Sequence, residues 1–208
     1  MGKGFFNMEA PVWHWIGKVP EMLGLSILWF VLSIPVLTMP AATSALYDAC
    51  ARALRPDEKG VFKRFFSTFG KEIKRSLLLG LLWGVLVVIL SIGNQILLTA
   101  AETDSTMAIF GVVYQISFLM PLAVFMWLNI LESRFFYSFW GLHKGAIIFV
   151  IGYLPYTALM VVILVVGVVA CFFVPMLTVL MPALIALLQS LPAEKVLKKH
   201  MPKEEGEE

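Results

Sequence analysis

The sequence predicts an all-α fold, a polytopic bundle of five transmembrane helices with an amphipathic interfacial helix on its cytoplasmic side. Of the 208 residues, 60% are hydrophobic, and the mean hydropathy is +0.86, whereas a soluble domain is about 45–50% apolar. A membrane span needs about 20 apolar residues, which at about 1.5 Å of rise each cross a hydrocarbon core of ~30 Å. Four segments without Asp, Glu, Lys or Arg are long enough: residues 22–47, 76–101, 105–131 and 145–193.

The last uncharged segment is long enough for two spans. As a single helix, its 49 residues would measure ~73 Å, more than twice the hydrocarbon thickness. Pro175 and Pro182 interrupt its second half, and we expect the chain to turn at residues 171–175. A span followed by a re-entrant hairpin is the alternative. The predicted bundle, residues 23–192, then has spans at 23–40, 76–99, 107–131, 145–170 and 176–191.

The placement of basic residues predicts the orientation. Of the 16 Lys and Arg, 14 fall in the loop of residues 48–75, in the connection after the third span, and in the charged tail of residues 193–208. The positive-inside rule places these segments in the cytoplasm. We therefore expect a multi-pass plasma-membrane protein with its C-terminus inside and its N-terminus outside. Residues 1–22 are aromatic with few charges, and we expect them to lie in the outer interface.

The basic loop contains an amphipathic helix at residues 60–75. Aromatic side chains recur at i, i+3 and i+4 spacing on one face, and mainly basic side chains occupy the rest. Such a helix lies flat on a bilayer, where each basic residue adds about 1 kcal/mol of attraction to anionic headgroups. It is interpreted as a collar for the second span, a docking surface for a partner, or a lipid-regulated switch. The residues of the predicted partner or lipid docking surface are Phe62, Lys63, Arg64, Phe65, Phe66, Phe69, Lys71 and Lys74.

The first span and this loop resemble a known family. The residues that carry the resemblance are Trp29-Phe30-Val31-Leu32-Ser33-Ile34-Pro35-Val36-Leu37-Thr38, Ala45-Leu46-Tyr47, Val61-Phe62 and Phe65-Phe66, followed by Phe69 and Lys74. The pattern is similar to that of the YesL-like family, small bacterial integral membrane proteins of unknown function. The resemblance implies a bacterial plasma membrane and a frequent genomic association with carbohydrate uptake systems. It implies no established activity.

Three uncharged polar residues lie within the predicted spans. Asn94 and Gln95 are near the outer end of the second span, and Gln115 lies at a similar depth in the third. A short loop joins these spans, so we expect a hydrogen bond between Gln115 and one of the other two. Such a bond holds two helices together and contributes about 0.6 kcal/mol. A site that contacts a solute is the alternative.

The inner end of the third span carries Asn129, Glu132 and Arg134. Asn129 and Glu132 share one helix face at i, i+3 spacing. We expect Glu132 to be an interfacial charge that pairs with a basic neighbour. A gate or a proton-handling group is the alternative.

Small residues recur every fourth position at the start of the second span, at Ser76, Gly80 and Gly84. This spacing lets two helix backbones approach closely, either within one chain or between two copies. In the third and fourth spans, Pro121 and Pro155 each remove a backbone donor and are expected to kink their helices.

The sequence offers no candidate catalytic residue, cofactor site or metal site. It lacks a phosphate-binding loop and the His-Glu-x-x-His and Gly-x-Ser-x-Gly patterns. The small net charge gives no indication of nucleic-acid binding. Our first hypothesis is a non-enzymatic accessory or scaffold protein, which contacts the lipid bilayer and either transporter subunits or itself. A small-solute carrier or channel, acting alone or as an oligomer, is the second hypothesis, and a membrane enzyme is the third.

Overall fold

The computed structural model describes residues 11–53, 60–102, 105–135 and 137–200. Residues 1–10 of the predicted N-terminal interfacial segment, and residues 201–208 of the predicted tail, lie outside this part of the chain. Within it, all regular structure is helical. The elements in order are α1 (Pro11–Ser33), the 3-10 helix η1 (Val36–Thr38), α2 (Met39–Ala53), α3 (Val61–Ala101), α4 (Ser105–Ser117), α5 (Leu119–Arg134), α6 (Phe139–Gly152), α7 (Leu154–Phe173), the 3-10 helix η2 (Pro175–Val179) and α8 (Met181–Leu197).

Three helices are long and apolar enough to cross a membrane: Val61–Ala101, Thr106–Arg134 and Leu154–Phe173. They overlap the second, third and fourth predicted spans, although the fourth, residues 145–170, is divided between α6 and α7. The all-α class is therefore confirmed together with three candidate membrane-spanning helices, and the five spans are not.

The first predicted span, residues 23–40, is not one continuous helix. Helix α1 ends at Ser33 because Pro35 has no N–H to continue the hydrogen-bonding pattern, and its ring disfavours a helical backbone at Ile34. After η1, the chain turns into α2, which packs back against α1 and α3. The small side chains of α2 are almost fully buried there, with Ala41, Ala42 and Ala45 all at 0% exposure.

The predicted interfacial helix is the first part of the 41-residue helix α3, continuous with the second span. Gly60, which precedes α3, has a φ of 97°, a left-handed conformation that suits glycine. The aromatic face does not lie free. Phe65 is fully buried, and Phe69 is partly buried against the same cluster of side chains from α1, α2 and α8. A separate helix lying flat on the bilayer is therefore not observed.

Both prolines expected to kink spans stand next to helix breaks. Pro121 cannot donate to the carbonyl of Ser117, and α4 ends at that residue before α5 begins at Leu119. Pro155 stands at the start of α7, and Tyr153, with φ −122° and ψ 42°, separates α7 from α6.

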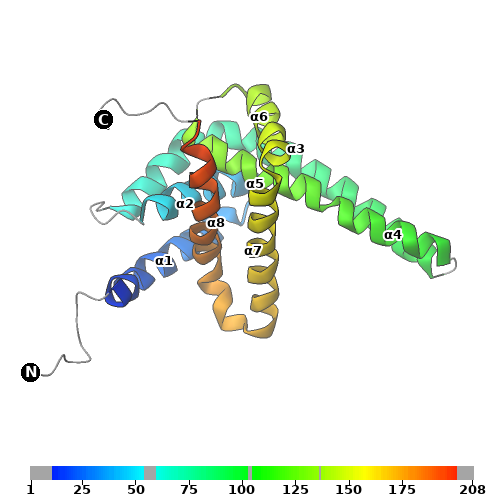
Figure 1. Cartoon of the computed structure of the whole chain (residues 1–208), viewed down its shortest axis with the longest axis horizontal. Helices are drawn as coiled ribbons and strands as arrows, with labels where there is room; N and C mark the ends of the chain where they lie inside the picture. The colour runs from blue at the N-terminus through cyan, green and yellow to red at the C-terminus, as the bar shows by residue number, and fades with distance from the viewer. Residues whose placement is uncertain (1–10, 54–59, 103–104, 136, 201–208) are drawn as a thin grey trace, which may run out of the picture.

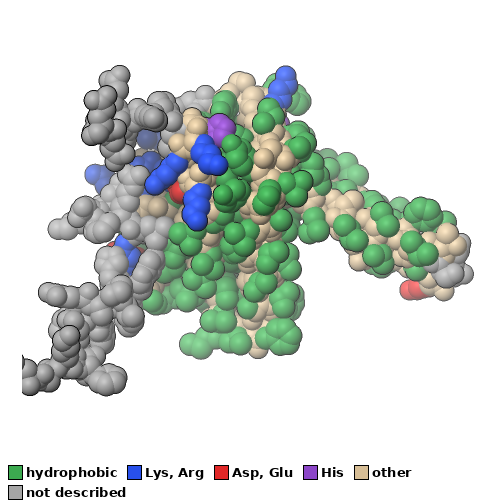
Figure 2. Space-filling view, in the orientation of Figure 1, with side chains coloured by type: hydrophobic (Ala, Val, Ile, Leu, Met, Phe, Trp, Pro, Cys, Tyr) green, Lys and Arg blue, Asp and Glu red, His purple; other side chains and the backbone are tan. Residues whose placement is uncertain are grey.

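Figure 1 shows two helical hairpins that leave a common body in different directions. The first is an arm made by the second half of α3 and by α4, residues 81–102 and 105–117. The second hairpin consists of α7, η2 and the start of α8. The Lys and Arg side chains visible in Figure 2 gather mostly at the end of the molecule away from the tip of the arm, and hydrophobic side chains cover both hairpins.

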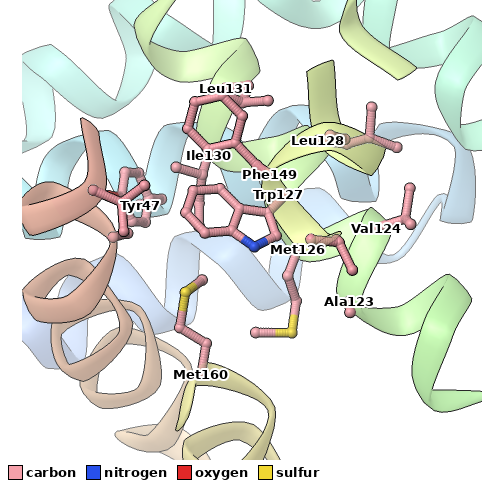
Figure 3. Close-up of a cluster of buried hydrophobic side chains, with 14 of the residues drawn as sticks. Tyr47, Ala123, Val124, Met126, Trp127, Leu128, Ile130, Leu131, Phe149 and Met160 are labelled. Atoms are coloured by element: carbon pink, nitrogen blue, oxygen red, sulfur yellow. The ribbon is translucent and has the colours of Figure 1, made fainter. Parts of the chain in front are cut away.

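The body has two hydrophobic clusters. In the larger one, Trp127 of α5 is fully buried among side chains from α2, α6, α7 and α8 (Figure 3). Its indole N–H donates to the hydroxyl of Thr157 at 2.9 Å, and its ring packs on Phe149 with centroids 5.1 Å apart. The smaller cluster joins α1, α2, α8 and the start of α3 around Phe65. These clusters hold the helices that carry the charged residues described next.

Candidate functional site

The most concentrated group of polar contacts is a buried cluster of ion pairs where α2, α3, α5 and α8 meet. On α2, the carboxylate of Asp48 is 6% exposed and pairs with three arginines, Arg52 at 3.1 Å, Arg64 at 3.4 Å and Arg134 at 3.7 Å. The hydroxyl of Thr68 also donates to Asp48, at 2.9 Å. One aspartate therefore connects α2 to both α3 and α5.

Glu132 of α5 is the second acidic centre of the cluster, and its side chain is 0% exposed. It pairs with Arg75 of α3 at 3.3 Å, which is the kind of basic neighbour that the sequence predicted. Two hydroxyls also donate to it, from Ser44 at 2.9 Å and from Ser76 at 3.2 Å. Ser44 lies 3.4 Å from Asn129 as well, so Asn129 and Glu132 do share one face of α5.

The third acidic group, Glu194, ties the end of α8 to the same cluster. It accepts hydrogen bonds from the guanidinium of Arg134 and, at 3.2 Å, from the hydroxyl of Tyr47. Burial, with a further contribution from the charge of Glu194, raises the pKa of Tyr47 well above its usual value, so this phenol stays protonated and remains a donor at neutral pH. The first residues of the predicted charged tail are therefore a docked helix end.

Charged groups this deeply buried are stable only when their donors and acceptors are satisfied. Here two arginine nitrogens, Nη2 of Arg75 and Nε of Arg134, are buried without a hydrogen-bond partner. The cluster therefore contains two N–H donors that form no hydrogen bond within the protein.

A charged pocket of about 470 Å³ lies beside the ion pairs, between α2, the first part of α3 and the end of α5. Its lining residues are Asp48, Arg52, Gly60, Lys63, Arg64, Ser67, Thr68, Lys71, Glu72, Glu132, Ser133, Arg134 and Phe135.

An apolar cavity of about 600 Å³ lies among α1, α2, α5, α7 and α8. Its walls are mostly aliphatic and aromatic, with the amides of Asn129 and Gln189 among the few polar groups. Asn129 lines this cavity, and Glu132, one turn further along α5, lines the charged pocket. The layer of buried polar side chains therefore lies between the cavity and the pocket. Cys50 of α2 is buried in the smaller hydrophobic cluster. Burial raises the pKa of its thiol to about 12, so this thiol is not a nucleophile at neutral pH.

The predicted docking residues of α3 divide into two groups. Phe62 and Phe66 are 40% and 52% exposed, and all three of the predicted lysines of this segment are exposed. Phe65 differs from the prediction, because α3 packs into the body along this edge and leaves the ring no surface on which to meet a partner. Arg64 is half-buried and pairs with Asp48.

The polar residues of the arm are not brought together into a site. Gln95 and Gln115 are exposed, and Asn94 is partly buried with its Oδ1 unpaired. The described part of the chain contains no hydrogen bond between Gln115 and either of the other two. The two helices of the arm are joined instead by Tyr114, whose hydroxyl donates to the carbonyl of Leu90 at 3.1 Å.

The small residues of α3 also have different surroundings. Ser76 belongs to the ion-pair cluster, and at Gly80 a side chain would collide with the backbone of Leu37 in η1. Gly84 has open space around it. Packing within the chain therefore accounts for Ser76 and Gly80 but not for Gly84.

The sequence contains a signal for this cluster at the ends of its uncharged segments. The charged residues that bound the four uncharged segments on the basic side are Asp48, Arg75, Glu132, Lys144 and Glu194. All of them except Lys144 belong to the cluster. A charged residue at the end of an apolar helix is placed next to the corresponding residue of each neighbouring helix, so this position predicts mutual pairing.

A helical chain with three helices able to cross a membrane, and with most of its visible Lys and Arg gathered at one end, fits an integral membrane protein. Residues 22–93 match the model of a family described as proteins of unknown function, DUF624, the family to which the YesL-like proteins belong. The predicted resemblance is thus confirmed over the second half of α1, all of α2 and most of α3. Neither the curated proteins nor the solved structures include a match to this chain.

Proposed function

We propose that this protein is a non-enzymatic accessory or scaffold component of the bacterial plasma membrane, associated with carbohydrate uptake or cell-envelope transport. The observation that carries the proposal is the surface of α3 at residues 60–75. There, exposed aromatic and basic side chains stand on a helix that is held firmly in the body. The association with carbohydrate uptake rests on the resemblance to the YesL-like family.

The exposed face of this helix has the composition of a protein interface. Phe62 and Phe66 are separated by one helical turn, and the same segment of α3 carries the exposed Lys63, Lys71 and Lys74. Aromatic residues are enriched in the centre of protein–protein interfaces, where they contribute large apolar contacts. The buried Phe65 and the hydrogen bond from Thr68 to Asp48 fix the helix beneath them. A partner would therefore meet a surface that needs little reorganisation on binding.

The proposed orientation places this surface in the cytoplasm, with the N-terminus outside and the C-terminus inside. The gathering of Lys and Arg at one end of the molecule supports it. A reporter fused to the C-terminus checks it. Cytoplasmic activity is expected, and a periplasmic signal would contradict this topology.

The accessory role is tested by purification from native membranes in mild detergent, followed by mass spectrometry of the copurified proteins. We expect transporter subunits in stoichiometric amounts with the wild type and a marked loss with Phe66→Ser. The matched control is Trp140→Ser on α6, which removes an aromatic side chain that is 73% exposed on a different helix. Recovery of the wild-type protein alone would refute the accessory role.

A small-solute carrier or channel is the second candidate. Two cavities favour this candidate. The apolar cavity reaches Asn129 and the charged pocket reaches Glu132, and the layer of buried polar side chains lies between them. Two cavities separated by a thin layer suit a solute that crosses when the layer rearranges. Uptake of labelled solutes into vesicles that contain the purified protein tests this candidate.

A further inference from the structure

The charged pocket has an excess of positive charge. Its lining has five basic residues and three acidic ones. Residues 54–59, next to the pocket in sequence, add Arg55 and Lys59 against Asp57 and Glu58, so their charges cancel. A net positive lining favours an anion inside the pocket.

The acidic residues of the lining are already engaged. Asp48 is shared by three arginines, and Glu132 is held by Arg75 from outside the pocket. Glu72 lies 4.0 Å from the same Arg75. Lys63 and Lys71, in contrast, form no ion pair within the described part of the chain. These two ammonium groups remain available to a ligand.

The pocket lining also contains further hydrogen-bond donors. Arg134 lines the pocket with a side chain that is only 9% exposed, and its unpaired Nε is enclosed by the protein, so its guanidinium acts on a ligand mainly through its charge. On α3, Lys63, Ser67 and Lys71 follow one another at intervals of four residues, so they share the helix face that lines the pocket. Ser133 adds a second hydroxyl from α5. Guanidinium, ammonium and hydroxyl groups on converging helices are the donors that phosphate oxygens accept best.

We propose that the charged pocket binds a phosphate ester through Lys63, Lys71 and Arg134. The ester can belong to the headgroup of an anionic phospholipid or to a soluble metabolite. Both present negatively charged phosphate oxygens, with one charge in a phosphodiester and up to two in a monoester. The volume of about 470 Å³ lies within the range of small-ligand sites and holds a phosphate together with a glycerol-sized substituent. The docking surface proposed above shares Lys63 and Lys71 with this pocket, but Phe66 does not line the pocket, so Phe66→Ser tests the docking role separately.

The experiment is native mass spectrometry of the purified full-length chain in detergent. One arm titrates dioleoylphosphatidylglycerol, with dioleoylphosphatidylcholine as the neutral comparison lipid. The other arm titrates glycerol 3-phosphate and inorganic phosphate. The test variant is Lys63→Ser with Lys71→Ser. The matched control is Lys144→Ser with Lys198→Ser, which removes the same charge from exposed positions outside the pocket lining and outside the docking surface. Melting temperatures verify that all variants remain folded.

We expect phosphatidylglycerol or glycerol 3-phosphate to bind the wild type. Between the two lipids, phosphatidylglycerol should bind and phosphatidylcholine should not. Each lysine that contacts the anion should contribute about fivefold in affinity, so the double variant should bind about 25-fold more weakly. The control should bind like the wild type. Binding of the lipid alone identifies a headgroup site, and binding of glycerol 3-phosphate identifies a soluble ligand. Equal weakening in both double variants, equal binding of the two lipids, or no binding of any probe would overturn the proposal.

Discussion

The two halves of α3 differ sharply in their surroundings although they belong to one continuous helix. In the body, its residues Phe65, Ser76, Leu79 and Gly80 are buried against neighbouring helices. In the arm, Gly111 is the only buried residue among those whose burial is described. The body half ends in the ion-pair cluster, whereas the arm half packs mainly on α4.

This difference shows how the chain divides its polar and apolar surfaces. Polar side chains of the body are buried and bonded to one another, so the body is stabilised by contacts within the protein. The arm exposes Leu, Ile and Val on all sides, a pattern that suits hydrocarbon or another protein rather than water. We therefore expect substitutions in the body to change stability strongly, and equivalent changes in the arm to change it little.

The largest effect is expected for Glu132→Ala. The substitution removes the closest ion-pair partner of Arg75, which is partly buried, and the carboxylate that accepts hydrogen bonds from the hydroxyls of Ser44 and Ser76. Breaking a buried ion pair by removing one partner costs about 3–5 kcal/mol. Thermal unfolding in detergent measures the loss. The matched control in the arm is Glu102→Ala, at an exposed position, where we expect almost no change.

The pairing itself is tested by adding Arg75→Ala to Glu132→Ala. If the cost arises from the uncompensated guanidinium, the double variant should be more stable than the sum of the single effects predicts. Strict additivity would show that Glu132 is important for another reason.

The next effect in size is expected for Gly80→Ala. The new methyl group would overlap with the backbone of Leu37, which cannot move aside as a flexible side chain can. Overpacking of this kind costs about 1–3 kcal/mol. One turn away, Gly84→Ala meets no atom and should stabilise the helix by up to about 1 kcal/mol. A similar destabilisation at both positions would indicate that Gly84 contacts a second copy of the chain.

The sequence predicted the helices better than their contacts. The lengths of the uncharged segments predicted α3, the α4–α5 pair and α7, since the need to bury backbone in a membrane depends only on composition and length. Pro35 was visible in the sequence, but the apolar run continues through it, so the break after Ser33 was missed. Phe65 was placed on an outer face because helical periodicity shows which residues share a side but not what that side contacts.

The site was predicted only where the pairing depends on neighbours in sequence. Asn129 and Glu132 were identified because they lie one turn apart on a single helix. Ser44, Tyr47 and Glu194 were not, because their hydrogen bonds cross between helices that are distant in sequence. The uncharged polar residues Asn94, Gln95 and Gln115 lie in the arm, whereas the paired charged groups lie at the ends of the uncharged segments.

A smaller effect is expected for Tyr114→Phe in the arm. The substitution removes the hydrogen bond from Tyr114 to the carbonyl of Leu90 but keeps the ring against Gly93. Hydrogen bonds between membrane helices contribute about 0.6 kcal/mol on average. Amide hydrogen exchange should show faster opening of α3 and α4 near these residues, with no change in the body. Tyr137→Phe, at a position 40% exposed outside the arm, is the control and should leave exchange in the arm unchanged.

The smallest effect is expected when the exposed amides of the arm are replaced, in Gln95→Leu with Gln115→Leu. Neither side chain is buried, so no contact within the chain is lost, and leucine is easier than glutamine to place against hydrocarbon. Unfolding free energy should stay within about 0.5 kcal/mol of the wild type, and yield in the membrane should not fall. Size-exclusion chromatography with light scattering completes the measurement, because the molar mass it gives shows whether the arm associates with a second copy of the chain. A clear loss of stability or a smaller assembly in the variant would show that these amides hold the arm against a second chain, and the comparison between body and arm would then apply to the monomer alone.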